Sequence, residues 1–138
     1  MYYYTNLLQN TPIQNLKQSI IAIMNSHDKT TNLDYLIGLS KGNSKFVEEM
    51  IEIFLTENPK EIRSLEESIR NEDFVLIKTS AHKMKSTIPF VGLDIIIGED
   101  LSEIEKLSLE KRDINRIITL LKKIKEVCIK ATQELQSF

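Results

Sequence analysis

Hydrophobic residues recur at helical spacing along most of the chain. From residue 45 onward they stand three or four positions apart, which places them on one side of an α-helix, and they do not alternate as in a β-strand. Four such stretches predict helices at about 44–70, 74–88, 93–108 and 114–138. Because the connections between them are very short, successive helices must lie antiparallel. We therefore predict an all-α, antiparallel up-down four-helix bundle.

The first predicted helix contains a proline, Pro59, which would normally break it. The hydrophobic stripe keeps its phase across this proline, with Asn58 occupying one position of the stripe, so we predict one long helix that is kinked or briefly broken there. Asn58 and Glu61 have the spacing of a capping box for its second half, and Asp113 is placed to cap the last helix.

The first 43 residues differ in composition from the rest, being rich in Asn, Thr, Ser and Gln. Residues 12–24 carry one helical stripe of hydrophobic positions, and residues 33–39 form a second, shorter hydrophobic patch. We expect two short N-terminal accessory helices: a peripheral helix at the first stripe and a cover helix at the second.

Composition narrows the class of protein. A length of 138 residues fits one domain. With 18 basic and 20 acidic residues the net charge is -2, so no overall electrostatic field attracts the protein to nucleic acid or an anionic membrane. The single cysteine, Cys128, excludes a disulfide framework within the chain and a cysteine-built zinc site. No hydrophobic run approaches the roughly 18 residues of a membrane span, and the N-terminus lacks a signal-peptide pattern. We expect a soluble, cytoplasmic domain.

Charges are segregated along the chain. Residues 48–73 carry nine acidic and three basic side chains, whereas residues 111–130 carry seven basic and two acidic ones. The basic stretch on its own would suggest an RNA or lipid partner. We instead expect the two stretches to form complementary solvated faces of one bundle.

Candidate chemistry centres on two histidines, since the sequence contains no phosphate-binding loop, no nucleophile elbow and no zinc-protease motif. His27 lies in a polar turn and is expected to be solvated. His82 lies on its predicted helix roughly 130° from the centre of the hydrophobic face, so it should face water. The residues that share this face are Val75, Lys78, Thr79, Lys85, Ser86 and Pro89, with Lys83 further round the helix.

Two interpretations of His82 follow from this environment. An exposed imidazole among lysines and small or hydroxylic side chains suits the transfer of a dianionic phosphoryl group. Alternatively, His82 is an ordinary solvated histidine on a lysine-rich surface. Periodicity alone favours the second interpretation, because single exposed histidines are common.

The local sequence AHKMKSTIPFVG, residues 81–92, resembles the phosphorylation-site helix of histidine phosphotransfer (HPt) domains, which are intermediates of bacterial multistep phosphorelays. The pattern of that family has a histidine after an alanine, a lysine three positions later, and an apolar residue followed by glycine near the next helix. The matching positions are Ala81, His82, Lys85, Val91 and Gly92. The resemblance extends over about residues 32–136, which divides the chain into an N-terminal extension, 1–31, and an HPt-like bundle, 32–138.

The resemblance implies a phosphorelay carrier, with His82 accepting a phosphoryl group from the aspartyl phosphate of one receiver domain and passing it to another. Lys85 and Lys83 would offset the phosphoryl charge. The docking surface for the receiver would include Lys78, Thr79, Ser86 and Pro89. The implied partners are response regulator receiver domains or a hybrid sensor histidine kinase, and Mg²⁺ would belong to the receiver. We accordingly expect a monomer with no metal or cofactor of its own and no independent enzymatic activity.

The chain departs from the family pattern after Lys85, where Ser86 replaces the usual glycine. Several family members also place a polar side chain of the next helix against the histidine; a direct count reaches Ile104, with Glu103 beside it, so that role is not transferred to this chain. The alternative function is a helical adaptor that has the same bundle and carries no phosphate.

Overall fold

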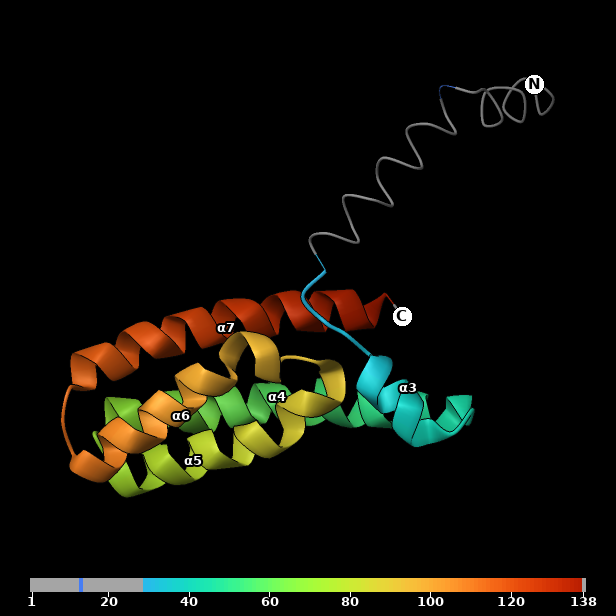
Figure 1. Cartoon of the computed structure of the whole chain (residues 1–138). Helices are drawn as coiled ribbons and strands as arrows, with labels where there is room; N and C mark the ends of the chain where they lie inside the picture. The colour runs from blue at the N-terminus through green and yellow to red at the C-terminus, as the bar shows by residue number, and fades with distance from the viewer. Residues whose placement is uncertain (1–12, 14–28, 138) are drawn as a thin grey trace.

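A computed structural model of the chain describes residues 13 and 29–137, and residues 29–137 form five α-helices, one 3₁₀ turn and no strand. These elements are α3 (Asp34–Ser40), α4 (Ser44–Arg70), α5 (Phe74–Thr87), η1 (Ile88–Val91), α6 (Asp94–Glu110) and α7 (Ile114–Gln136). The four long helices run side by side in alternating directions (Figure 1). The all-α up-down bundle predicted from the sequence is confirmed.

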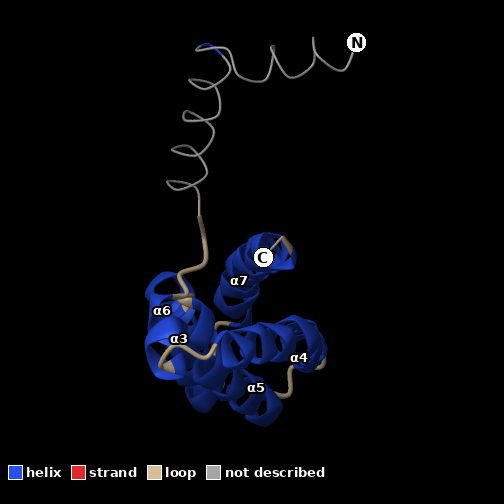
Figure 2. Ribbon diagram, turned by 90° about the vertical axis from the view of Figure 1, so that its right-hand side faces the viewer, coloured by secondary structure: helices blue, strands red, loops and turns tan. Residues whose placement is uncertain are grey.

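The four long helices surround one hydrophobic core. Each packs against two neighbours, α4 against α5 and α7, and α6 likewise against α5 and α7. Viewed from the end, they enclose a common centre (Figure 2). The largest completely buried side chains are Leu36, Leu65, Ile77, Met84, Ile88, Leu93, Ile97, Leu101, Ile104, Ile117, Ile124 and Val91. None of the helices in the described part has both the length and the hydrophobicity needed to cross a membrane.

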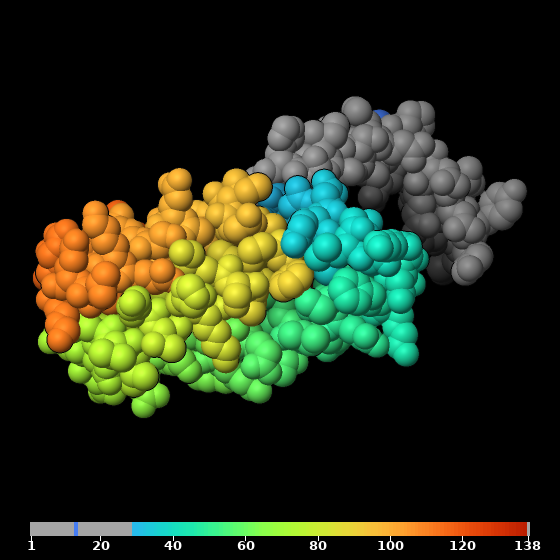
Figure 3. Space-filling view, turned by 60° about the horizontal axis from the view of Figure 1, so that its bottom comes forward, coloured from blue at the N-terminus to red at the C-terminus, as the bar shows by residue number. Residues whose placement is uncertain are grey.

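The short helix α3 closes one end of the bundle, as expected for a cover helix. It lies against α4 and η1 (Figure 3) and buries Leu36 completely, while the ring of its Tyr35 stands 6.2 Å from that of Phe90. The segment before it is fastened to the end of α7, because the Glu134 carboxylate accepts the backbone N–H of Thr30 at 2.7 Å. The predicted peripheral helix at residues 12–24 lies outside the described residues except for Ile13, so it stays a prediction.

Helix α4 continues through Pro59 without a break, so the prediction that Asn58 and Glu61 cap a second half is wrong. No new helix start exists for these side chains to cap, and both are buried, with exposed fractions of 3% and 4%. The real cap lies at the beginning of α4, where the Asn43 side chain accepts the backbone N–H of Phe46 at 3.2 Å.

Two smaller expectations also differ from the structure. Asp113 precedes α7 but does not cap it with its side chain: its backbone is left-handed, with φ 57°, and its carboxylate accepts a hydrogen bond from the Arg112 guanidinium at 2.7 Å. The hydrophobic pattern places Ile96 on the buried stripe of α6, yet it is 37% exposed while Leu93 and Ile97 are fully buried. The buried stripe of α6 is therefore narrower than the sequence pattern suggests.

The basic face of α7 pairs with two neighbouring helices. One ion pair reaches α4, as expected from the acidic stretch there, and two reach α6. These pairs are Lys125 with Glu66, Arg116 with Glu103 at 2.6 Å, and Lys123 with Asp100 at 2.8 Å. Acidic side chains of both neighbouring helices, α4 and α6, thus pair with the basic residues of α7.

A close backbone contact joins the segment before α3 to the turn between α5 and α6. The Asn32 N–H donates to the Val91 carbonyl at 2.9 Å. The next residue, Gly92, has φ 77°, and a Cβ at that position would lie 2.6 Å from the Asn32 carbonyl oxygen. Glycine is required here both by the left-handed backbone and by the lack of space.

Glu61 places a carboxyl group inside the bundle, between α4 and the end of α5. The Thr87 hydroxyl donates to its Oε2 at 3.1 Å. Burial raises the pKa of Glu61, and the bond from Thr87 and the charge of Lys83 only partly oppose that effect. The carboxyl group therefore resists ionisation in the folded protein.

Replacing Gly92 by alanine should lower the free energy of unfolding by about 2–4 kcal/mol, since it adds left-handed strain and a clash with Asn32. Gly42 is the matched control, because its φ is 85° and a Cβ added to it would meet nothing within 4 Å. Gly42→Ala should cost only the conformational part, about 1–2 kcal/mol. Urea denaturation measures both, and equal losses would contradict the proposed effect of the contact.

Replacing Glu61 by glutamine should stabilise the protein increasingly as pH rises. The pKa of Glu61 is raised in the folded protein, so protonated Glu61 contributes its full stability below the pKa of the unfolded chain, about 4.3. That contribution is lost as pH rises through the pKa of the folded protein. Glutamine keeps an oxygen acceptor for Thr87 and does not ionise. Unfolding free energies measured from pH 4 to 8 test this, with the exposed Glu67→Gln as control; a difference between Glu61→Gln and wild type that does not change with pH would contradict it.

Candidate functional site

Helix α5 presents His82 to solvent in the way its sequence pattern predicts. The helix buries Ile77, Ala81 and Met84 in the core, and the His82 side chain, on the other side, is 78% exposed. Its start is capped by Asp73, whose carboxylate accepts the Leu76 N–H at 3.2 Å. The prediction that His82 faces water is confirmed.

A carboxylate from α6 joins His82 to Lys85. Glu105 Oε1 lies 3.1 Å from His82 Nδ1, and Glu105 Oε2 lies 3.5 Å from Lys85 Nζ. The Glu105 side chain is only 18% exposed, so its position is well constrained by the surrounding helices. In neutral imidazole, a carboxylate at Nδ1 selects the tautomer with the proton on that nitrogen and leaves the Nε2 lone pair free. The carboxylate therefore orients the imidazole and leaves one ring nitrogen free.

Sequence reasoning missed Glu105. A direct count along the sequence reaches Ile104, which is fully buried, and Glu103, whose carboxylate binds Arg116 of α7 at 2.6 Å. One residue along a helix changes direction by about 100°, so a count in error by one selects a different neighbour. The available signal was the position of Glu105 immediately beside the buried Ile104, on the edge of the buried stripe of α6.

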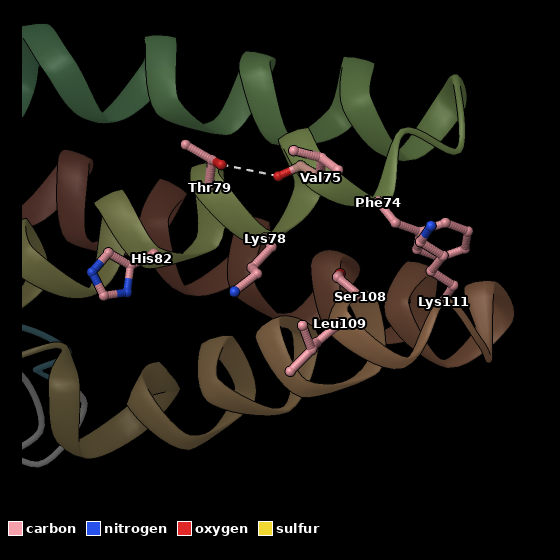
Figure 4. Close-up of a pocket in the computed structure, with 8 residues that line it drawn as sticks. All are labelled: Phe74, Val75, Lys78, Thr79, His82, Ser108, Leu109 and Lys111. Carbon is pink, nitrogen blue, oxygen red and sulfur yellow. Dashed lines mark hydrogen bonds between the residues drawn. The ribbon is translucent and has the colours of Figure 1, made fainter.

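Lys78 and Thr79 lie with His82 along a groove between α5 and the end of α6 (Figure 4). The groove has a volume of about 480 Å³. The Thr79 hydroxyl donates to the Val75 carbonyl at 2.9 Å, so it is engaged by its own helix. The complete lining consists of Phe74, Val75, Lys78, Thr79, His82, Ser108, Leu109 and Lys111.

The groove is both apolar and basic. Val75 and Leu109 are 69% and 67% exposed, on α5 and α6 respectively, and Lys78 and Lys111 line the groove with them. The groove thus combines exposed apolar side chains with two positive charges.

The other three predicted residues do not line this groove. Ser86 is exposed, and its hydroxyl donates to the Lys83 carbonyl at 2.6 Å, which keeps the side chain close to the helix. Pro89 is half-buried in η1, directly after α5 ends at Thr87. Lys83 is exposed and its charge acts on Glu61 of α4. The structure thus brings Lys85 to His82 through Glu105, while it places Lys83 toward the opposite neighbour.

No group of three or more His, Cys, Asp or Glu side chains is gathered as a metal site would require within the described residues. His27, the second histidine, lies outside those residues. The polar groups gathered at the described site are one imidazole, one carboxylate and the nearby lysine ammonium groups.

Comparison with known proteins identifies the fold. The chain is similar to the crystal structure of the HPt domain from an Hpt sensor hybrid histidine kinase of Shewanella, with a TM-score of 0.61 and 18% sequence identity. The match covers 79% of this chain and 96% of that chain. No protein-family model and no curated protein sequence matches the chain. The resemblance to HPt domains is therefore confirmed in the fold.

Removing Glu105 should change the tautomer of His82. In the wild-type protein the neutral ring should carry its proton on Nδ1, whereas in Glu105→Ala the Nε2–H form should gain roughly fivefold in relative population, the equivalent of about 1 kcal/mol for an exposed charged hydrogen bond. Ring ¹⁵N chemical shifts report the tautomer, and His82→Ala assigns the signal. Glu103→Ala, on the same helix but bonded to Arg116, is the matched control; identical ¹⁵N shifts in wild type and Glu105→Ala would refute the assigned role.

Proposed function

We propose that the protein is a phosphorelay carrier, which accepts a phosphoryl group on His82 from the aspartyl phosphate of a receiver domain and passes it to another receiver. The observation that carries this proposal is the exposed imidazole of His82 with Glu105 at its Nδ1, on a bundle with the fold of an HPt domain. The carboxylate at Nδ1 holds the ring in the orientation that transfer to Nε2 requires.

The transfer step follows from the orientation of the ring. The Nε2 lone pair attacks the phosphorus of the aspartyl phosphate, a P–N bond forms, and the P–O bond to aspartate breaks with its electron pair leaving on the carboxylate. The ring keeps its Nδ1 proton and becomes positively charged. Glu105, 3.1 Å from Nδ1, stabilises that charge electrostatically. Transfer to the second receiver reverses these steps.

Lys85 is the residue best placed to offset the charge of the phosphoryl oxygens. Its side chain is 34% exposed, and its ammonium group is held beside the imidazole by the other oxygen of Glu105. Lys83 contributes at longer range, because it stands toward Glu61. In this proposal the receiver supplies the aspartate and the Mg²⁺, and the carrier, acting as a cytoplasmic monomer, supplies the histidine and is not an enzyme by itself.

The receiver would dock over His82 on a surface that includes Lys78, Thr79, Ser86 and Pro89. The exposed Val75 and Leu109 add apolar contact area beside the reactive ring. The Ser86 and Thr79 hydroxyls each donate a hydrogen bond to a carbonyl of their own helix, so neither side chain projects far from it. The two side chains therefore do not obstruct the approach of a partner to the imidazole. A receiver with an apolar patch bordered by acidic side chains complements this surface.

Phosphotransfer from a radiolabelled, phosphorylated receiver domain tests the function directly. Wild type should acquire an acid-labile, alkali-stable label, and His82→Ala should acquire none. Lys85→Ala should lower the initial rate about tenfold, because one partly exposed positive charge is removed from the transition state.

His27→Ala is the matched control, since it removes the other histidine and should label like wild type. Equal labelling of His82→Ala and wild type would overturn the assignment of the phosphorylated residue. No labelling with any receiver tested would favour the alternative, a helical adaptor that carries no phosphate.

A further inference from the structure

An apolar groove lies where α3 meets the beginning of α6, at the end of the bundle that α3 closes. It has a volume of about 520 Å³. Ile37 of α3 and Ile95 and Ile96 of α6 line it, and these side chains are 52%, 85% and 37% exposed. The three isoleucines lie outside the buried core and outside the groove that contains His82. We call this feature the α3–α6 groove.

Further exposed apolar side chains surround the α3–α6 groove. Tyr35 and Leu39 are exposed on α3, so three of the seven residues of this short helix present large hydrophobic side chains to solvent. Tyr35 and Ile95 also line an adjoining hollow. Single exposed hydrophobic residues are ordinary, whereas a cluster on two adjacent elements is typical of a surface that another apolar element covers.

The chain enters its described part beside this groove. Residues 29–31 line the groove together with the isoleucines. The hydrophobic stripe predicted at residues 12–24 ends at Met24, five positions before Lys29. Five residues reach at most about 17 Å, and a helix over residues 12–24 measures about 20 Å. The stripe is therefore within reach of the groove in the same chain.

The stripe is apolar enough to cover the groove. Its hydrophobic positions are Ile13, Leu16, Ile20 and Met24, and residues 12–24 carry one charged side chain, Lys17. Ile13, the member of the stripe that the structure describes, is helical and 68% exposed. Contact between the stripe and the groove would remove apolar surface of both from water. The short connection also gives the stripe a local concentration in the millimolar range, so even a weak intrinsic affinity suffices.

From these observations we propose that residues 12–24 dock as an amphipathic helix in the α3–α6 groove of the same chain. The hydrophobic stripe of the segment packs against the three isoleucines, in the way that an amphipathic helix occupies an apolar groove. Docking is independent of His82 and of the proposed phosphotransfer.

The experiment measures paramagnetic broadening in the ¹⁵N-labelled full chain. Gln18 lies on the side of the predicted helix opposite the stripe, so Gln18→Cys accepts a nitroxide label without disturbing the contact. Cys128 is only 3% exposed and should stay unlabelled. The amide signals of Ile37, Ile95 and Ile96 should lose intensity until the nitroxide is reduced, while that of Lys111 should not. Equal intensities before and after reduction would overturn the proposal.

Substitutions in the groove separate docking from the mere proximity of a tethered label. Ile95→Asp places a charge in the groove at a surface position and should abolish most of the broadening at Ile37 and Ile96. Ile118→Asp is the matched control, because Ile118 is 48% exposed on α7 and does not line the groove. Broadening that is the same in Ile95→Asp and Ile118→Asp would refute the assigned groove.

The stripe is tested in the same spin-labelled chain. Ile20→Asp interrupts the stripe and should remove the broadening, whereas Asn15→Asp, on the opposite side of the predicted helix, should leave it unchanged. Equal broadening in these two variants would show that the stripe makes no contact with the groove.

A mixture of two samples identifies the chain that supplies the segment. One sample is spin-labelled and lacks ¹⁵N, and the other is ¹⁵N-labelled and lacks the nitroxide. Because the proposed contact lies within one chain, the mixture should show no broadening at the groove. Broadening in the mixture would assign the groove to the segment of a second copy and would overturn the proposal.

Discussion

The packing of α5 against α6 is the contact on which both the core and the candidate site depend. These two helices make the most extensive contact of any pair in the described part of the molecule. Ala81 contributes to it because it is fully buried and occupies little space between the helices. The same contact brings Glu105 to within 3.1 Å of the imidazole of His82 on the neighbouring helix. A change in the relative position of the two helices would therefore alter the hydrophobic core and the orientation of the His82 imidazole together.

The turn between these helices determines how they are aligned. η1 follows α5 directly, Pro89 lies in its first turn, and Gly92 then reverses the chain in a left-handed conformation. The backbone of Asn32 packs against that glycine, so the segment before α3 also restrains the turn. The end of the bundle that holds α3 thus contributes to a site that lies further along α5.

The buried face of α4 carries two polar side chains, which distinguishes this part of the bundle from the apolar core around it. Asn58 and Glu61 occupy positions where a simple bundle would carry apolar side chains, and both are buried. The Glu61 carboxyl group accepts a hydrogen bond from Thr87, at the end of α5, whereas the Asn58 amide lies against the thiol of Cys128, a weak acceptor. Burial raises the pKa of that thiol to about 11, so Cys128 behaves as an apolar core residue. The buried polar groups of α4 thus meet partners on two sides, Glu61 toward α5 and Asn58 toward α7.

By itself, the sequence determined the helices, their antiparallel order and the exposure of His82, because hydrophobic periodicity and short connections are local properties that any compact arrangement of this chain must satisfy. It also indicated, through a short motif, the family whose fold the chain shares. Only the tertiary structure decided that Glu105, and neither Glu103 nor Ile104, contacts His82. A contact between two helices depends on their relative rotation and shift, which the sequence pattern does not specify. An error of one residue in the count rotates the chosen side chain by about 100° around the helix. The tertiary structure also decided the positions of Asn58 and Glu61. Their spacing fits a helix cap, but α4 continues through Pro59, and both side chains are buried in the core.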